Sequence, residues 1–197
     1  GVCKALIEIE GKPFICRLLD YYGDRGIVER LLLTGNWEMP AYPDDLLQIQ
    51  EPRRLGTGGA VLSAKQYLNN PCIIVNGDSF VPGLDFDDVL AVYTRAKKAG
   101  LMVVYARQWP VEDGEQPNTQ ILGGLVEQYS KEHRSTLMHH VDAGVFVTSP
   151  HEFSAYAKDV EYPFDLGVVY RRMIRANQLA NYETKQIPYE IGSPEGL

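Results

Sequence analysis

The sequence contains few cysteines and no pattern that would use them as a set. Cys3, Cys16 and Cys72 are widely spaced, and none belongs to a C-x-x-C motif or a Cys/His ligand pattern. A disulfide framework and a zinc site are therefore not indicated, and a reducing cytoplasm fits best. No stretch approaches the roughly 18 apolar residues of a membrane span, and the first residues lack the layout of a signal peptide. We expect a cytoplasmic protein without a membrane partner.

Basic runs are also missing. The formal net charge is −7, and no block of five or more Lys or Arg occurs. This composition argues against a nucleic-acid backbone as partner, while a small anionic substrate held by local donors stays open. The chain has 197 residues, of which 45% are hydrophobic, and this is the size of one domain. We predict a single domain over residues 1–197.

Apolar runs alternate with helix-period stretches in the first half of the chain. Strands are expected where aliphatic residues run together between turn residues, at 28–33, 46–49, 72–75 and 101–105. Helices are expected around the apolar stripes Phe14, Leu18, Leu19, Tyr22 and Phe86, Val89, Leu90, Tyr93. This alternation predicts an α/β fold whose mostly parallel sheet is covered by helices on both faces.

The pattern changes after the last of these strands. Residues 108–120 are rich in Pro, Gly, Glu and Asn and predict a loop. Strand-like segments follow at 121–129 and 145–147, and a helix is expected after Pro163, with Asp165 as its cap. Both ends of the sequence are abrupt, so we expect a fragment of a longer fold.

The strongest local motif is Leu55-Gly56-Thr57-Gly58-Gly59-Ala60, which opens the helical stretch 61–68. Glycines let backbone N–H groups approach a ligand closely, and a helix N-terminus favours electron-rich groups. No Gly-Lys-Ser/Thr follows, so the motif is not a Walker P-loop, and Val61 stands where a dinucleotide fingerprint has its third small residue. These residues support a nucleotide contact and a plain tight turn about equally.

Charged residues supply further candidates. Asp78 follows an apolar run, so a strand would deliver it to the edge of the sheet where ligands gather and where a carboxylate can bind Mg²⁺. The alternative for Asp78 is a turn or cap residue. Lys131 can clamp a phosphate, although a lone lysine is usually a solvated surface residue. The pair His139-His140 has no Cys or carboxylate at ligand spacing, so we interpret it as surface or packing.

The order of the short motifs is more specific than any one of them. In order they are Lys4-Ala5-Leu6-Ile7 with Gly11-Lys12-Pro13-Phe14, Glu51 ahead of the glycine-rich motif, Asn76-Gly77-Asp78, Asp142-Ala143-Gly144-Val145-Phe146, and Glu190-Ile191-Gly192-Ser193-Pro194-Glu195. In this order they resemble the sugar-1-phosphate nucleotidyltransferases, which make nucleoside-diphosphate sugars. The resemblance covers nearly the whole chain and is greatest to the branch with heptose- and mannose-1-phosphate guanylyltransferases.

This resemblance implies a fold, a reaction and a set of roles. The fold would be Rossmann-like, and a sugar-1-phosphate oxygen would attack the α-phosphate of a nucleoside triphosphate and release pyrophosphate, with Mg²⁺ as cofactor. By position, the resemblance gives catalytic roles to Lys4 and Asp78. It further assigns the base to Glu51, Gly56 and Gly59, the sugar phosphate to Gly124, Lys131 and Asp142, and the metal to Asp78 and Glu190.

The match has gaps. The family's first strand and its glycine-rich loop ending in Thr-Arg have no counterpart, Cys3 and Glu190 replace the family's proline and aspartate, and the C-terminal helix is absent. We therefore expect a chain truncated at both ends that folds, binds its ligands weakly, self-associates and releases no pyrophosphate.

Two alternatives stay open. One is a non-catalytic ligand-sensing or subunit-interaction module of the same fold. The other, weaker one is a dinucleotide-binding oxidoreductase that uses Gly56, Gly58 and Asp78. The nucleobase, the sugar and the oligomeric state do not follow from these motifs.

Overall fold

The structure, a computed structural model, describes residues 3–25, 27, 29–35, 37, 46–107 and 116–191. The helices are α1 (Phe14–Gly23), α2 (Thr57–Ser63), α3 (Phe86–Ala96), α4 (Pro150–Ala157) and α5 (Leu166–Arg175), with the short 3-10 helices η1 (Lys4–Leu6) and η2 (Lys65–Tyr67). The strands are β1 (Glu8–Ile9), β2 (Lys12–Pro13), β3 (Leu31–Thr34), β4 (Leu47–Gln50), β5 (Cys72–Val75), β6 (Ser79–Phe80), β7 (Gly100–Ala106), β8 (Thr119–Leu122), β9 (Leu125–Tyr129), β10 (His140–Thr148), β11 (Leu179–Thr184) and β12 (Tyr189–Glu190).

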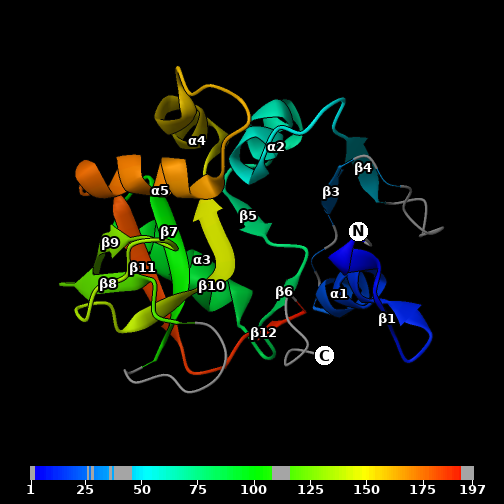
Figure 1. Ribbon diagram of the computed structural model, residues 1–197, viewed down its shortest axis with the longest axis horizontal. Helices are drawn as coiled ribbons and strands as arrows, with labels where there is room; N and C mark the ends of the chain where they lie inside the picture. The colour runs from blue at the N-terminus through cyan, green and yellow to red at the C-terminus, as the bar shows by residue number, and fades with distance from the viewer. Residues whose placement is uncertain are drawn as a thin grey trace.

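A six-stranded sheet in the order β5-β10-β7-β11-β9-β8 forms the centre of the molecule (Figure 1). β7 and β11 pair in parallel, whereas β10 runs antiparallel between β5 and β7, and β9 is antiparallel to β11. The α/β class is confirmed, and the expected sheet of mostly parallel strands is corrected to a mixed one. A strand buried on both faces is an apolar run in either direction, so the pattern of β10 does not reveal its sense.

Helices cover both faces of this sheet, as the alternation of strands and helices predicts (Figure 1). Successive side chains of β7 point to opposite faces. Leu101, Val103 and Tyr105 join the core formed with α1 and α3, while Met102 and Val104 join the core formed with α4 and α5. Every one of these five side chains is at most 7% exposed. One strand thus contributes to two cores, which explains its unbroken apolar run.

Helix starts follow the residues expected at caps. The Asp85 carboxylate accepts hydrogen bonds from the backbone N–H groups of Asp87 and Asp88 at 3.0 and 3.1 Å at the start of α3. Asp165 occupies the predicted cap position of α5, but its side chain makes no capping bond. Instead, the Thr57 hydroxyl of α2 accepts a hydrogen bond from the N–H of Leu166 at 3.1 Å. The start of α5 is therefore tied to the start of α2.

The remaining expectations concern strand boundaries. β3 and β4 form a parallel pair of their own, in which residues 31–34 lie beside 47–50. In the described part of the chain, no ladder joins this pair to β5. The expected strand at 121–129 is a hairpin of β8 and β9, and β8 begins inside the expected loop. The other residues of that loop up to 115, and Val28, lie outside the described residues.

Among the described helices, none has the length and apolar composition needed to cross a membrane.

Candidate active site

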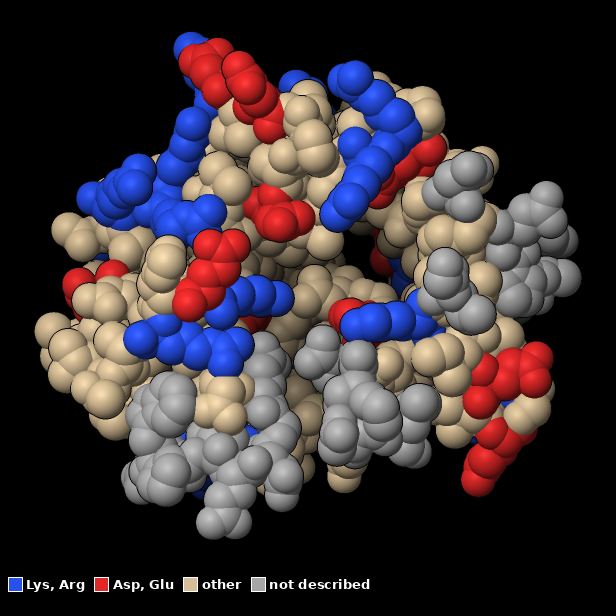
Figure 2. Space-filling model, viewed as in Figure 1, with Lys and Arg blue, Asp and Glu red and all other residues tan. Residues whose placement is uncertain are grey.

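A cavity of about 2380 Å³ is lined by residues of the central sheet, of the β3–β4 pair and of helices α1, α2 and α5. The face seen in Figure 2 is hollowed, and side chains of both charges gather around the hollow. Single small-molecule pockets commonly span about 300–1,000 Å³. This cavity therefore has room for two substrates at once.

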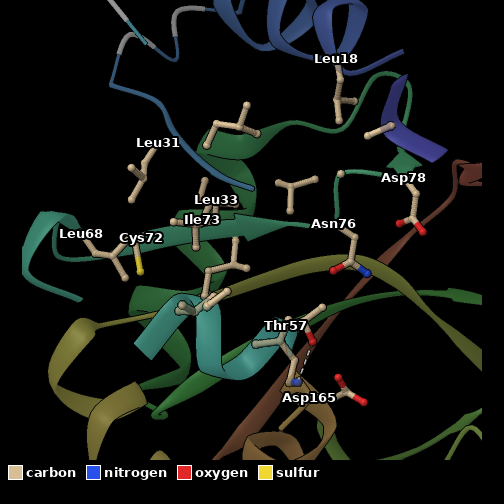
Figure 3. A pocket seen from close by; sticks show the side chains of 18 of the residues that line it. Leu18, Leu31, Leu33, Thr57, Leu68, Cys72, Ile73, Asn76, Asp78 and Asp165 are labelled. Atoms are coloured by element: carbon tan, nitrogen blue, oxygen red, sulfur yellow. Dashed lines mark hydrogen bonds between the residues drawn. The ribbon is translucent and has the colours of Figure 1, made fainter. Parts of the chain in front are cut away.

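The lining of the cavity changes in character from one end to the other (Figure 3). Leu31, Leu33 and Ile73 lie together at one end, where the strands β3 and β5 face it. Asn76 and Asp78, which follow β5, carry polar atoms to the other end. The carboxyl end of β5 thus delivers polar groups to the cavity, as expected for an α/β sheet.

The glycine-rich motif packs against a later segment of its own chain. The backbone N–H groups of Gly58 and Gly59 donate to the carbonyl oxygen of Phe164 at 3.0 and 3.1 Å. Gly56 has a φ of +77°, and a Cβ there would lie 2.4 Å from the same oxygen; a Cβ on Gly59 would lie 2.8 Å from the ring of Tyr162. These amides are used inside the protein, which supports the tight-turn interpretation, although Gly56 itself lines the cavity.

Lys4 and Glu51 line the cavity from two other elements. Lys4 is the first residue of η1 and is exposed. The Glu51 carboxylate accepts a hydrogen bond from the N–H of Leu55 at 2.9 Å, and the Glu51 N–H donates to the carbonyl oxygen of Thr34 at 2.8 Å. Glu51 therefore fixes the approach of the chain to the glycine-rich motif.

The backbones of Asp78 and Glu190 are neighbours. In the antiparallel pair of β6 and β12, Glu190 lies opposite Ser79, and the N–H of Ile191 donates to the carbonyl oxygen of Asp78 at 3.1 Å. The Asp78 carboxylate accepts a long hydrogen bond of 3.4 Å from the Ser79 hydroxyl. The side chain of Glu190 is outside the described part of the structure, so a cation shared by the two carboxylates stays a prediction.

Asp142 of β10 is held by a dense set of polar contacts. Its carboxylate accepts a hydrogen bond from the N–H of Gly144 at 3.0 Å, and its own N–H donates to the side-chain oxygen of Asn118 at 3.0 Å. Burial raises the pKa of the Asp142 carboxyl, while the Gly144 N–H, the charge of Lys131 and the Tyr129 hydroxyl act in the opposite direction. The cavity therefore contains a carboxyl group that keeps its proton more readily than an exposed one.

The structure brings most of the predicted residues together. The two exceptions in the described part of the chain are Gly59, which lies under the ring of Tyr162, and Gly124, which forms the β8–β9 turn with a φ of +81°. The Gly124 carbonyl accepts a hydrogen bond from the N–H of Asn181 at 3.3 Å. The predicted residues that line the cavity are Lys4, Glu51, Gly56, Asp78, Lys131 and Asp142.

Comparisons with known proteins show which fold this chain has. No protein-family model matches the chain. The chain is 31% identical over 85 residues to D-glycero-alpha-D-manno-heptose 1-phosphate guanylyltransferase from Campylobacter jejuni, a match that covers 39% of this chain and 38% of that protein. The structure is similar to HddC from Yersinia pseudotuberculosis complexed with GMP-PN, with a TM-score of 0.76, 21% identity and coverage of 99% of this chain and 87% of that one. This chain has the sugar-1-phosphate nucleotidyltransferase fold.

A second solved structure extends the likeness. The inositol-1-phosphate CTP transferase from T. maritima matches with a TM-score of 0.76 and 15% identity, covering 100% of this chain and 83% of that one. The resemblance predicted from the motifs is therefore confirmed at the level of the fold. The matched sequence spans well under half of the guanylyltransferase's length.

The nucleotidyltransferase fold also brings residues to the cavity that the sequence analysis missed. Asp165 was expected as a helix cap, and its carboxylate lines the cavity instead. Arg171 of α5 lines it as well. Because Arg171 is one of three arginines on the same short helix, with Arg172 and Arg175, no spacing or motif in the sequence distinguishes it.

Proposed function

We propose that this chain binds a nucleoside triphosphate and a sugar 1-phosphate in one site, and that the reaction this site serves is transfer of the nucleoside monophosphate to the sugar 1-phosphate with release of pyrophosphate. The supporting observation is that residues from five separate segments, Lys4, Glu51, Asp78, Lys131 and Asp142, line one cavity in a chain of this fold. The named relatives act as transferases toward a heptose 1-phosphate and an inositol 1-phosphate.

In this reaction the protein contributes by positioning the substrates and stabilising their charge. A phosphate oxygen of the sugar 1-phosphate forms a bond to the α-phosphorus, and the bond from that phosphorus to the oxygen bridging it to the β-phosphate breaks, so that pyrophosphate leaves with the electron pair. The attacking phosphate is already an anion near pH 7, because its second pKa is about 6. No side chain has to remove a proton, and catalysis rests on orientation and electrostatic stabilisation.

Each cavity residue then has a task. The ammonium groups of Lys4 and Lys131 supply positive charge to the two substrates. Asp142 provides hydrogen-bonding oxygens for a sugar hydroxyl. Glu51 and Gly56 form the wall beside the base.

The residues present fit Mg²⁺. Mg²⁺ in phosphate sites is usually held by one or two carboxylates together with substrate oxygens. Asp78 lines the cavity, and the backbone of Glu190 runs beside it. In the part of the chain with described side chains, no group of three His, Cys, Asp or Glu is gathered for a metal, so we assign the role to Asp78 and Glu190 with substrate phosphates. The ion would neutralise phosphate charge.

The proposal extends to the cell compartment. Cys3, Cys16 and Cys72 are all free thiols, and free thiols are the rule where the compartment is reducing. We therefore place the protein in the cytoplasm, where both substrates would reach it.

Direct binding tests the proposed function. Isothermal calorimetry with ATP, GTP, CTP, UTP and dTTP in the presence of Mg²⁺ should show saturable binding of at least one triphosphate. Mannose 1-phosphate, glucose 1-phosphate and a heptose 1-phosphate are titrated next, and pyrophosphate release is then measured for each pair that binds. If the chain binds none of the five triphosphates, the proposal is wrong. Enhanced NADH fluorescence with no triphosphate binding would favour the oxidoreductase alternative.

A further inference from the structure

Arg171 lies folded against its own helix in a space that exists because residue 167 is glycine. A Cβ built on Gly167 would lie 3.2 Å from Nη1 of Arg171 and 3.0 Å from Cε1 of Tyr129. The guanidinium therefore lies beside the Tyr129 ring, one helical turn back from its own Cα. Any larger residue at 167 would displace the guanidinium, the ring or both.

Tyr129 gives this guanidinium a fixed neighbour. Its side chain is 7% exposed and packs edge-on against Tyr170, with ring centroids 5.3 Å apart. The Tyr129 hydroxyl also bonds to the Asp142 carboxylate. Tyr129 thus connects Arg171 on one side with Asp142 on the other, and Lys131 follows two residues later in the chain.

Arg171 and Lys131 both line the cavity, and no other described residue occupies their donors. Neither side chain makes a hydrogen bond or an ion pair with any residue that the structure describes. The charge of Lys131 acts on Asp142, but the two are not within ion-pair distance. Two cavity-lining cations whose donors no described residue occupies favour an anionic ligand.

The chemistry of the pair fits a phosphate monoester. An arginine fork binds two phosphate oxygens at once, and a lysine adds a compact point charge. Lys4, the other cavity lysine among the described residues, belongs to η1 next to the N-terminus, away from α5 (Figure 1). The anion at Arg171 is therefore separate from one held at Lys4.

We propose that Arg171 binds the phosphate of the sugar 1-phosphate, together with Lys131, and that Gly167 is required because it leaves room for the guanidinium. This inference rests on the proposed function and deepens it by assigning a side chain that decides between a phosphorylated and a neutral sugar. The triphosphate is not expected to touch Arg171.

Calorimetry on the full chain tests this assignment with mannose 1-phosphate and mannose as probes. The unaltered chain should bind mannose 1-phosphate and not mannose. Arg171→Met should weaken mannose 1-phosphate binding about 10- to 100-fold, the range expected for losing charge-assisted hydrogen bonds, and should change triphosphate binding less than about 3-fold. Arg171→Lys should recover part of the loss, because the charge returns without the fork.

Matched variants on the same helix make the outcome specific. Arg175→Met removes the same charge one turn along α5, outside the cavity lining, and should leave mannose 1-phosphate binding unchanged. Gly167→Ala should weaken it with Arg171 still present, and circular dichroism monitors folding of every variant. Unchanged binding of mannose 1-phosphate by Arg171→Met, or an equal loss of triphosphate binding, would overturn the inference. Triphosphate binding by the unaltered chain would still support the proposed function.

Discussion

The backbone N–H of Gly58 donates a hydrogen bond of 3.0 Å to the carbonyl oxygen of Phe164. The segment before α5 therefore sits directly on the glycine-rich motif, and the N–H of Phe164 returns a bond of 2.9 Å to the carbonyl oxygen of Leu55. Two cavity-lining segments, at Gly56 and at Asp165, are locked to each other through these contacts. Glycine is needed here for packing at least as much as for contact with a ligand.

Substitution of these glycines should reveal that packing role. In Gly56→Ala the new Cβ meets the Phe164 carbonyl oxygen at 2.4 Å, and the φ of +77° adds strain. We expect a loss of about 3 kcal/mol or more, or a fall in Tm of about 6–12 °C. Gly123→Ala is the control, because its φ is +58° but nothing lies within 4 Å of its Cβ. It should cost about 1–2 kcal/mol in thermal unfolding followed by circular dichroism, and equal losses in the two variants would contradict this account.

Asp142 should make stability depend on pH. Because burial raises the pKa of its carboxyl in the native state above that of the unfolded chain, the native state binds this proton more tightly. Stability is therefore fully present below the unfolded pKa of about 3.9 and is lost as the pH rises through the native pKa. Asp142→Asn removes the ionisation and can still accept the Gly144 hydrogen bond, so its Tm at pH 8 should be higher by about 2–4 °C per kcal/mol regained.

The pH profile of the same variant provides the internal control. The difference in Tm between Asp142→Asn and the unaltered protein should shrink toward zero below about pH 3, where the carboxyl is protonated in both states. A difference in Tm that does not change with pH would show that the carboxyl has the same pKa in both states, and a deficit of the variant that grows as the pH rises would show that the native protein stabilises the ionised carboxylate; either outcome contradicts this prediction.

Cys72 should resist alkylation in the folded protein. Its thiol is 8% exposed and donates a hydrogen bond of 3.4 Å to the carbonyl oxygen of Thr148, and burial raises its pKa to about 11. At pH 8 only about one thiol in a thousand would be the reactive thiolate. Iodoacetamide followed by mass spectrometry should therefore modify half-buried Cys3 first, and Cys72 only after unfolding in guanidinium. Equal rates for Cys3 and Cys72 would contradict the burial of Cys72.

Some of the fold could be predicted from the sequence because it depends on the local spacing of apolar residues. The stripe Phe14, Leu18, Leu19 and Tyr22 is buried in α1, and the apolar run at 72–75 is β5 without any change of boundary. The sense of β10 could not be predicted, since both faces of that strand are buried. The separation of the β3–β4 pair from β5 could not be predicted either. Strand pairing depends on contacts between residues that are distant in the sequence.

Some residues of the candidate site could likewise be predicted from the sequence, and others could not. Asp78 and Lys131 carry chemistry in short motifs, so they could be named before the structure, and both line the cavity. The family resemblance assigns Glu51 to contact with the nucleobase. Its hydrogen bond with the Leu55 N–H could not be predicted, because that contact forms only in the folded turn. The position of the Arg171 side chain depends on the space left by the missing Cβ of Gly167. The spacing of residues in the sequence does not show which side chain occupies that space.

Asp78 should make triphosphate binding depend on Mg²⁺. Its carboxylate lines the cavity at the carboxyl end of β5, and its one described hydrogen bond is the long contact of 3.4 Å from Ser79. An amide at this position keeps the shape but loses the charge that attracts a divalent cation. For Asp78→Asn we expect the affinity for the triphosphate with Mg²⁺ to fall about 10-fold or more, equivalent to about 1.4 kcal/mol, and the affinity measured in EDTA to stay within about 2-fold of the unaltered protein.

Asp159→Asn is the matched control for this experiment, because Asp159 is exposed and lies outside the cavity lining. It makes the same chemical change with the same effect on net charge, so any general electrostatic effect on an anionic ligand appears in both variants. The quantity compared is the ratio of the dissociation constants with and without Mg²⁺, measured by calorimetry. That ratio should collapse toward one in Asp78→Asn and stay unchanged in Asp159→Asn. If Asp78→Asn keeps the ratio of the unaltered protein, the carboxylate of Asp78 does not hold the metal, and the assignment passes to other oxygens of the cavity.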